Sequence, residues 1–398
     1  MFVSNNKTVA VLDIGSSKIT TIIASVYDDE FEIIGSGNYL SEGIRNGEIS
    51  DVKRARATIA SSVYEAEKLS GKNIDKVIVS VSNPLLRSRT ITIKTNFGGN
   101  QILPSDIKKL KSMVLSKIDL TKNEVLSYKV LKYDLDDMKD IVDPEFMFAN
   151  LLTAYAHVTT VPLKHLVNMG SCLLGCQLKI GNFVPSSKAS AEACLTEEEK
   201  REGCVLIDIG AGCSDYIAYK NKQIVGCGVV PIGGANITKD IAEYFSIDLD
   251  SAEKIKLLHG GLTKTLSEDK RTIETKTSKQ INSQTLNRVV IARFSEIMGF
   301  LMERLKEKKQ NRSCLSRVVF TGGCSKISGM LEFIEEKYKL NARVAGPSSI
   351  KTENGFSEDS SFSTAVGLLR SYSEKTKKPL SHDRSKIKRA FLWLKQNF

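Results

Sequence analysis

Two segments of the chain repeat one pattern of residues around an aspartate. Residues 9–24 read VAVLDIGSSKITTIIA and residues 204–219 read CVLIDIGAGCSDYIAY. When Asp13 is aligned with Asp208, the glycines two positions later coincide, and an apolar strand lies on each side of both. Each copy predicts a β-hairpin whose turn presents backbone amides. Because small residues let phosphate approach such amides closely, two matching copies favour one phosphate site shared by both hairpins.

Two further glycine turns have the sequence context of a nucleotide site. Residues 318–330, VVFTGGCSKISGM, predict a strand that runs into a glycine pair and then a helix, and residues 231–238, PIGGANIT, lead into another helix. Ligands of α/β proteins bind at the carboxyl ends of strands, and helix N-termini favour anions. The turn at 318–330 has the spacing neither of a P-loop nor of a G-x-G-x-x-G dinucleotide loop. A tight turn is the alternative for each alone, and the four together predict nucleotide binding.

The two aspartates are the candidate catalytic and metal-binding residues. Asp13 and Asp208 end their predicted strands on facing hairpins, where carboxylates hold Mg²⁺ mostly through water, beside the phosphates. Turn formation is the alternative role of an aspartate at a strand end. Two carboxylates beside a bound phosphate chain fit a chemistry in which a positioned water attacks a phosphate, with Mg²⁺ and backbone amides stabilising charge. The sequence indicates no residue that positions this water.

The composition is that of a globular protein with more than one domain. A length of 398 residues exceeds the roughly 100–200 of a single domain, and 41% hydrophobic with 26% charged residues excludes disordered, collagenous and disulfide-scaffold proteins. The eight cysteines form no C-x-x-C pair and predict reduced, buried thiols, not zinc ligands or disulfides. No apolar run approaches the roughly 18 residues of a membrane span, and the N-terminus has no signal-peptide pattern.

Most of the net charge of +11 lies near the C-terminus. Residues 375–398 hold eight Lys or Arg against one acidic residue, which favours an anionic membrane surface over nucleic acid, because nucleic-acid-binding proteins spread basic residues over a folded face. Residues 385–398 predict an amphipathic helix that follows a polar linker at 371–384. A helix packed on its own domain is the alternative. The residues expected at the membrane are Ile387, Lys388, Arg389, Phe391, Trp393, Leu394, Lys395 and Phe398.

Over nearly its whole length the sequence resembles the superfamily of actin, Hsp70 and sugar kinases and, within it, the FtsA family of bacterial cell-division proteins. The repeated hairpins specify only the superfamily. The stretch GIRNGEI at 43–49, the segment IVDP at 141–144 and the basic tail narrow the resemblance to FtsA. Further matching stretches lie at 232–241, 252–256, 321–330 and 363–369.

The resemblance implies an α/β, actin-like fold of two duplicated halves, each a twisted five-stranded sheet with helices on both faces. A small α+β subdomain is inserted in the first half, where the sequence predicts a helix from about residue 105 to 116 and strands near 128–133 and 151–159. The implied units are 1–82 with 165–203 and 363–380 (first half), 83–164 (inserted subdomain), 204–232 with 308–362 (second half), 233–307 (second subdomain), 371–384 (linker) and 385–398 (membrane helix).

The same resemblance implies which residues contact the nucleotide. The turn residues expected around the β- and γ-phosphates are Gly15, Ser16, Ser17, Lys18, Gly210, Gly212, Cys213 and Ser214. Lys18 would supply positive charge, unless it is an exposed strand lysine. The residues expected at a helix start near the nucleotide are Gly233, Gly234 and Asn236. Those expected around ribose and adenine are Glu253, Lys256, Gly322, Gly323 and Lys326. The alternative for Glu253 and Lys256, which are three residues apart on one helix, is a salt bridge exposed to solvent.

The second turn departs from the Gly-Gly-Gly-Thr usual in the family. Ala211 replaces a glycine and Cys213 replaces the threonine. An alanine at positive φ would be strained, and a missing hydroxyl removes a phosphate donor. These departures put hydrolysis in more doubt than binding.

A helix predicted over 288–306 carries the candidate partner contact. Arg293 and Glu296 partly match a family I-x-x-R-x-x-E-I stretch, in which Ala292 replaces an acidic residue. By resemblance these two residues contact FtsZ. The alternative is that both are surface charges on an amphipathic helix.

The function implied by the resemblance is that of an ATP-binding protein that polymerises on the cytoplasmic face of the bacterial membrane at the division site. It would anchor FtsZ filaments there, recruit later division proteins and turn over ATP slowly at most. Two alternatives are an actin-like ATPase of another membrane machine, such as a pilus or secretion platform, and a small-molecule kinase. The chain has no sign of the added substrate pocket of a kinase, nor of the β-rich substrate domain of an Hsp70-like chaperone.

Overall fold

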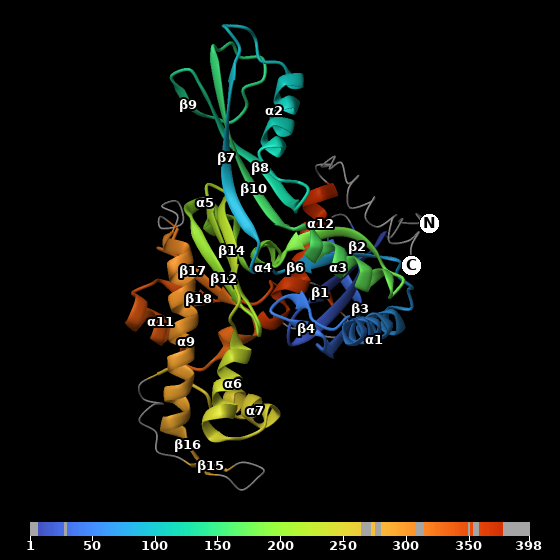
Figure 1. Cartoon of the computed structure of the whole chain (residues 1–398), viewed down its shortest axis with the longest axis vertical. Helices are drawn as coiled ribbons and strands as arrows, with labels where there is room; N and C mark the ends of the chain where they lie inside the picture. Colours follow the sequence, from blue (N-terminus) through green and yellow to red (C-terminus); the bar gives the residue numbers. More distant parts are fainter. Residues whose placement is uncertain are drawn as a thin grey trace.

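The computed structural model has two halves, each carrying a smaller subdomain (Figure 1). In that view an inserted strand-rich subdomain lies at the top, and helices α6 (Gly234–Phe245) and α7 (Leu249–His259) lie at the bottom. The structure describes residues 7–27, 30–263, 272–274, 280–307, 314–348, 351–352 and 358–376.

The first half is built on a six-stranded mixed sheet. Its strands are β1 (Lys7–Ile14), β2 (Lys18–Tyr27), β3 (Glu30–Leu40), β6 (Lys76–Val81), β11 (Lys179–Pro185) and β19 (Lys351–Thr352). They lie in the order β11-β6-β1-β2-β3-β19, with β1 antiparallel to β2 and parallel to β6. The prediction of five strands is wrong here, because β19 adds to the edge strand β3 from a segment assigned to the second half.

The second half repeats this arrangement on a five-stranded sheet, as predicted. Its strands are β12 (Cys204–Ile209), β13 (Ser214–Lys220), β14 (Gln223–Val230), β17 (Val318–Thr321) and β18 (Ala342–Val344). They lie in the order β14-β13-β12-β17-β18, and β12 is antiparallel to β13 and parallel to β17. β12 therefore has the same neighbours in the second sheet as β1 has in the first.

Helices cover both faces of both sheets. α4 (Ser186–Cys194) and α12 (Ser363–Thr376) share one core with Val11 of β1 and Leu206 of β12, so these two helices lie between the sheets. Leu12 of β1 faces the opposite way, into a core with α1 (Val52–Ser70) and α3 (Leu163–Leu174). Because β1 and β12 are buried on both faces, their sequences read as continuous apolar runs and not as alternating ones.

The inserted subdomain is a four-stranded sheet with one helix. Its elements are β7 (Arg87–Asn96), α2 (Pro104–Ser116), β8 (Asn123–Leu135), β9 (Met138–Ile141) and β10 (Leu151–Pro162). The strand order is β7-β10-β8-β9, and a separate apolar core joins this sheet to α2. The helix and the two strands predicted in this region from the sequence are confirmed.

The second subdomain is mainly helical. With α6 and α7 it contains α9 (Ser283–Lys306), β15 (Thr272–Glu274) and β16 (Gln280–Asn282). α9 begins five residues before the predicted start at 288, because the Oδ1 atom of Asn282 accepts a 3.0 Å hydrogen bond from the Thr285 amide and caps the helix. α9 packs in one core with α6 and α11 (Met330–Tyr338).

The last described helix corrects one predicted boundary. α12 continues to Thr376, so residues 371–376 are helical and do not belong to the linker predicted at 371–384. The predicted membrane helix, with its contact residues from Ile387 to Phe398, lies outside the described residues. Among the helices that the structure describes, none is both long enough and apolar enough to span a membrane.

Short elements complete the described fold. They are β4 (Ile44–Arg45), β5 (Glu48–Ile49), α5 (Glu197–Glu202), and the 3₁₀ helices η1 (Gly323–Lys326) and η2 (Ser360–Phe362).

Candidate functional site

The two predicted hairpins are present and have the same turn. The Gly15 amide donates a 3.0 Å hydrogen bond to the Lys18 carbonyl, and the Gly210 amide donates one of the same length to the Cys213 carbonyl. Asp13 therefore lies at the same point of its hairpin as Asp208 does. The internal duplication read from the sequence is a duplication of backbone geometry.

The four glycine elements meet at the junction between the halves. A Cβ atom on Gly212 would lie 2.6 Å from Oγ of Ser16, so the two turns touch. A Cβ atom on Gly233 would lie 2.4 Å from the Gly210 carbonyl oxygen, and one on Gly322 would lie 2.3 Å from Oδ1 of Asp208. Gly322 also has a φ of 88°, a conformation that favours glycine. Close packing at this junction therefore requires glycine at three positions.

Both turns have amides available for an anion. Among the described residues, the backbone amides of Ser16, Ser17, Ala211 and Gly212 donate no backbone hydrogen bond. Because unpaired backbone amides bind anionic oxygens well, and the two turns are in contact, these residues fit a phosphate chain placed between them.

The two candidate carboxylates are held by hydroxyl groups. Oδ1 of Asp13 accepts a 2.7 Å hydrogen bond from Ser80, and Oδ2 of Asp208 accepts hydrogen bonds of 2.5 Å from Ser190 and 3.1 Å from Thr364. Burial raises the pKa of Asp13 to about 6; the Ser80 hydrogen bond opposes this shift, and the negative charge of Asp208 adds to it. Burial also raises the pKa of Asp208.

A bound cation would stabilise the negative charges of Asp13 and Asp208, which burial disfavours. Within the described part of the chain, no group of three or more His, Cys, Asp or Glu side chains could hold a metal ion. Two carboxylates suit Mg²⁺, which keeps several waters and takes further ligands from phosphates. Asp13 and Asp208 therefore fit a water-mediated Mg²⁺ site better than a cage made by the protein alone.

Lys18 is not an exposed strand lysine. Its Nζ donates a 2.9 Å hydrogen bond to Oγ of Ser361 and lies 3.3 Å from the centroid of the Phe362 ring. Burial lowers the pKa of Lys18 to about 8, against the opposing effect of Asp13. Ser361 and Phe362 of η2 reach Lys18, and no sequence pattern predicted either contact.

Glu253 and Lys256 form a salt bridge, with the lysine buried. Nζ of Lys256 lies 2.6 Å from Oε2 of Glu253 and also donates to Oγ1 of Thr238 at 2.9 Å and to the Gly234 carbonyl at 3.2 Å. The pair therefore joins α7 to the N-terminal part of α6. The alternative prediction of a solvated salt bridge is wrong for Lys256, which is buried, whereas the Glu253 side chain is partly exposed. At the same turn, Oδ1 of Asn236 accepts a 3.1 Å hydrogen bond from the Gly233 amide.

The glycine turn after β17 leaves open space beside Gly323. A Cβ atom on Gly323 would meet only Ser361, at 3.8 Å. The exposed Lys326 forms a 2.8 Å ion pair with Asp359, the residue that caps η2. Lys326 and Lys18 thus both contact the chain around η2.

The expected strain at Ala211 is absent. Ala211 is not among the residues with positive φ, so an alanine adopts this turn without the conformation that favours glycine. The Cys213 side chain is buried, and burial raises the pKa of its thiol to about 12, so the thiol is uncharged at neutral pH. Ser214 donates from Oγ to the Ile232 carbonyl at 2.8 Å and so binds the neighbouring loop.

Arg293 forms an ion pair between two helices and is also partly exposed at the surface. It binds Asp240 of α6 through Nε at 2.5 Å and Nη2 at 2.8 Å, and it contacts Glu296 one turn along α9. The guanidinium side chain keeps 28% of its surface exposed. Contact with FtsZ stays a prediction for Arg293 and Glu296.

A functional candidate that sequence reasoning missed is Asp215. It lies opposite Asp208 in the β12–β13 pairing, and its Oδ2 accepts a 2.7 Å hydrogen bond from Ser82 of the first half. The available signal was its position seven residues after Asp208, on the strand that leaves the turn.

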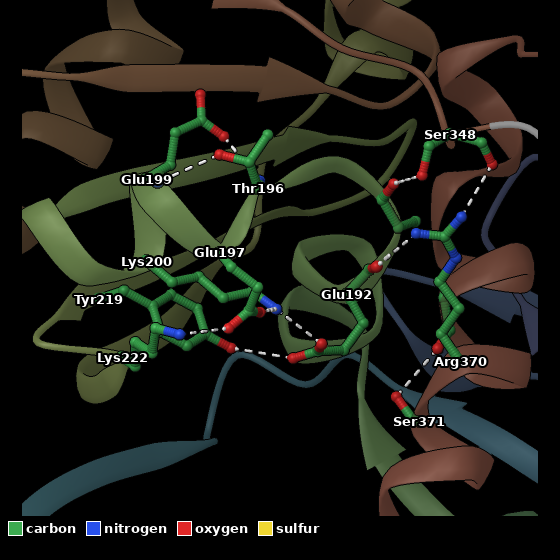
Figure 2. Close-up of polar contacts among 12 residues, drawn as sticks. Glu192, Thr196, Glu197, Glu199, Lys200, Tyr219, Lys222, Ser348, Arg370 and Ser371 are labelled. Atoms are coloured by element: carbon green, nitrogen blue, oxygen red, sulfur yellow. Dashed lines mark hydrogen bonds and ion pairs between the residues drawn. The ribbon is translucent and has the colours of Figure 1, made fainter. Parts of the chain in front are cut away.

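A second polar cluster holds the helices behind the site (Figure 2). Nζ of Lys200 lies 2.7 Å from Oε2 of Glu192 on α4, and both side chains are nearly buried. Arg370 of α12 donates from Nη1 to the Glu192 carbonyl at 3.3 Å and from Nη2 to the Ser348 carbonyl at 3.1 Å. Because α4 and α12 also carry the two hydroxyl groups that bind Asp208, this cluster fixes the helices that position that carboxylate.

Comparison with known proteins identifies the family. A relative from Neisseria meningitidis named Cell division protein FtsA is 30% identical over 368 residues, which cover 91% of this chain and 89% of the relative. The chain belongs to the FtsA family. FtsA relatives from Rhizobium meliloti and Buchnera aphidicola are 27% and 28% identical; they cover 91% and 100% of this chain, and the alignments cover 86% and 100% of the relatives. The family model described as Cell division protein FtsA matches residues 205–367.

Solved structures agree with the fold expected of the FtsA family. A PilM–PilN type IV pilus biogenesis complex has a TM-score of 0.64 at 15% identity, covering 91% of this chain and 97% of that one. MreB5 of Spiroplasma citri bound to ADP has a TM-score of 0.56 at 13% identity, covering 94% of this chain and 99% of that one. The predicted actin-like, two-lobed fold is therefore confirmed. The protein is a member of a cell-division family with this fold.

Proposed function

We propose that the protein binds Mg-ATP at the junction of its halves and uses it mainly as a ligand that controls conformation and assembly. The observation that carries this proposal is the contact between two matching turns whose amides are free to bind phosphate. Structures of MreB5 from Spiroplasma citri with ADP and with AMPPNP, at 13% identity, share the fold and support the choice of ligand.

In this proposal the bound nucleotide runs from the two turns toward α7 and η1. Mg²⁺ would neutralise phosphate charge and be held, through water, by Asp13 and Asp208. Lys18 would contact the terminal phosphates, since it leaves the first turn and its positive charge interacts with the charges of Asp13 and Asp208. The residues that would border ribose and adenine are Glu253, Lys256, Gly322, Gly323 and Lys326.

The protein would act at the cytoplasmic face of the membrane at the division site. Family membership supports a role in division, and the basic amphipathic pattern of 385–398 supports peripheral binding to anionic lipids. We place FtsZ on the subdomain at 233–307. Self-association into polymers and recruitment of later division proteins belong to the same proposal, with the inserted subdomain at 83–164 taking part in both. Nucleic acid is not among the proposed partners.

A second candidate function is that of an actin-like component of another membrane machine. The fold likeness to a PilM–PilN complex favours this candidate. It predicts binding to lipid without recruitment of FtsZ, whereas the division proposal predicts both.

The test is co-sedimentation of the full chain with anionic liposomes and purified FtsZ, with and without Mg-ATP. The division proposal predicts that FtsZ sediments only when both the protein and the lipid are present. Lipid binding without FtsZ would favour the second candidate. FtsZ recruitment that is unaffected by Mg-ATP would remove the assembly role proposed for the nucleotide.

A matched pair of variants tests the predicted membrane helix. Replacing Lys388, Arg389 and Lys395 with alanine should strongly reduce sedimentation with liposomes, as should deletion of 385–398. Replacing Lys377, Lys378 and Arg384 removes the same charge from outside that helix and should have a smaller effect. Equal losses would mean that net charge, and not an amphipathic helix, binds the lipid.

A further inference from the structure

The charges of the inserted subdomain are divided between two parts of its sheet. Residues 87–122, which form β7 and α2, include eight basic and two acidic residues, a net charge of +6. Residues 123–149, which form β8 and β9, include three basic and seven acidic residues, a net charge of −4. In the strand order β7-β10-β8-β9, β7 and β9 lie at opposite edges. The subdomain therefore has a basic edge at β7 and α2 and an acidic edge at β9.

Most of the side chains of the basic edge are exposed and unpaired. The basic edge consists of Arg87, Arg89, Lys94, Lys108, Lys109, Lys111, Lys117 and Lys122, and all of these except Lys111 are exposed. Lys109 forms an ion pair with Asp106, and Lys122 forms one with Asp119. Among the residues that the structure describes, five members have no carboxylate partner: Arg87, Arg89, Lys94, Lys108 and Lys117. Most of the positive charge is therefore available to an anionic partner.

The helix α2 presents much of this charge to solvent. Leu110 is buried against the sheet, whereas Lys109, Met113 and Lys117 are exposed. These three side chains follow one another at intervals of four residues, so they lie along one side of the helix. Arg89 of β7 reaches the end of the helix, where it donates a 3.0 Å hydrogen bond to the Lys117 carbonyl. Basic side chains from two elements therefore form one surface.

The segment predicted to bind the membrane follows α12, which lies on the side of the basic edge. In Figure 1, α12 lies below α2, and β9 lies on the other side of the inserted subdomain. Tyr372, near the end of α12, and Leu126 of β8 pack against one apolar core. α12 ends at Thr376, and the next eight residues, 377–384, span at most about 30 Å. A membrane that binds residues 385–398 is therefore held on the side of the basic edge.

We propose that the basic edge is a second contact with the anionic headgroups of the membrane, separate from residues 385–398. This inference rests on the proposed binding of the protein to the membrane and adds a folded surface to it. A basic residue near an anionic membrane strengthens binding by up to roughly fivefold. Two linked contacts also bind more tightly than either does alone. A second contact would fix the orientation of the folded protein on the membrane, which a flexible linker does not.

Nucleic acid is the other polyanion that binds basic surfaces. Lipid is favoured here because residues 385–398, which follow α12 on the same side, combine basic residues with large apolar ones, among them Trp393. Such a combination matches the interface between headgroups and acyl chains, whereas a phosphate backbone offers no apolar layer. One lipid surface therefore accounts for both basic regions of the chain.

The experiment measures binding of the full chain to vesicles of phosphatidylglycerol and phosphatidylcholine by co-sedimentation over a range of lipid concentrations. Lys108→Gln combined with Lys117→Gln removes two exposed charges that have no carboxylate partner. Its affinity for the vesicles should fall about tenfold at low salt. The difference from wild type should shrink at about 500 mM NaCl, because salt screens exposed charges.

The matched control is Lys239→Gln combined with Lys254→Gln. These lysines are also exposed, helical and without a carboxylate partner among the described residues, but they lie on α6 and α7. Figure 1 shows these two helices at the end of the molecule opposite to the inserted subdomain. The control should bind vesicles within about twofold of wild type, because charges far from the membrane are screened.

Each other outcome has a definite meaning. Unchanged binding by the Lys108 and Lys117 variant, or an equal loss in the control, would overturn the second contact alone. If the variant loses affinity for duplex DNA but not for vesicles, the basic edge binds nucleic acid instead. No binding of wild type to the vesicles would overturn the proposed membrane role as well. If thermal unfolding shows that the variant does not fold, Lys94→Gln on β7 is measured against the same criteria, with a loss of up to about fivefold expected.

Discussion

Lys18 and Ser361 join two distant segments of the chain at the candidate site: Nζ of Lys18 donates a 2.9 Å hydrogen bond to Oγ of Ser361, 343 residues later. Lys18 belongs to the first hairpin, and Ser361 lies in η2, directly before α12. The amine is thus held in place before any phosphate arrives. Its position links the first phosphate turn to the segment that also binds Lys326.

The affinity for Mg-ATP should fall at alkaline pH because of Lys18. Burial lowers the pKa of this amine to about 8, so the charge that attracts phosphate is largely present at pH 7 and is lost as the pH rises through 8. We expect an affinity loss approaching tenfold between pH 7 and pH 9, measured by equilibrium titration. Lys18→Met should bind more weakly at pH 7 and show a flat profile. A wild-type profile without this fall would remove Lys18 from the phosphate contact.

Asp208→Ala should weaken binding of ATP in the presence of Mg²⁺ much more than in EDTA. The carboxylate would act on the phosphates through the metal, so its removal matters only when the metal is there. Titrations of both proteins under both conditions measure the difference. Ser190→Ala keeps the carboxylate and removes one of its hydrogen bonds, and should have a smaller effect. Equal losses in Mg²⁺ and EDTA would point to a structural role for Asp208.

Stability of the nucleotide-free protein should decrease as the pH rises from 4 to 7. The pKa of Asp13 is about 6 in the folded protein, against 3.8 for a free side chain, so the folded state holds this proton more tightly. Its contribution to stability is complete below pH 4 and is lost as the pH rises through 6, by about 1–3 kcal/mol. Urea unfolding of Asp13→Asn should lack this part of the loss. Parallel curves for the two proteins would contradict the assignment.

Glu192→Gln should destabilise the protein by about 1–3 kcal/mol, because the buried Lys200 would lose the nearer of its two carboxylate partners and keep only Glu197, at 3.2 Å. Thermal unfolding measures this loss. The matched control is Lys179→Ala, which breaks an ion pair with Asp75 in which both side chains are more than 70% exposed, and should change stability little. Similar effects in both variants would mean that Glu192 and Lys200 are not effectively buried in solution.

Arg293→Glu should reduce recruitment of FtsZ to liposomes while leaving lipid binding unchanged. The substitution reverses a partly exposed charge, but it also breaks the ion pair with Asp240. Asp240→Ala breaks that pair and retains the arginine, so it separates the two effects in the same co-sedimentation assay. A defect of equal size in both variants would assign Arg293 to the packing of α9 on α6 instead of to partner binding.

The parts of the fold that the sequence predicted are those set by local pattern. The two hairpins follow from apolar runs on either side of a turn with Asp-Ile-Gly, and strands buried on both faces make such runs conspicuous. The duplication added what a single hairpin lacks, since it implied that two distant turns serve one site. Family resemblance supplied the two-lobed arrangement, which periodicity alone did not.

The parts that the sequence could not predict depend on contacts between distant segments. Nothing near Lys18 indicates that Ser361 will bind it, and Asp215 looks like any polar residue that follows a turn. β19 was missed because two residues at a sheet edge have no periodicity to detect. The prediction of strain at Ala211 was wrong for a related reason. The turn closes through the hydrogen bond from the Gly210 amide to the Cys213 carbonyl, and neither residue between them has a positive φ.

The pairing of β19 with the first sheet limits how the two halves can move. Val344 ends a strand of the second sheet, and Lys351 begins a strand of the first. Seven residue steps span at most about 25 Å, so the chain there is a tether of fixed reach between the two sheet edges. While β19 stays paired, the halves cannot part at this edge beyond that length. A separation of the two sheet edges beyond that length would therefore require β19 to leave the first sheet.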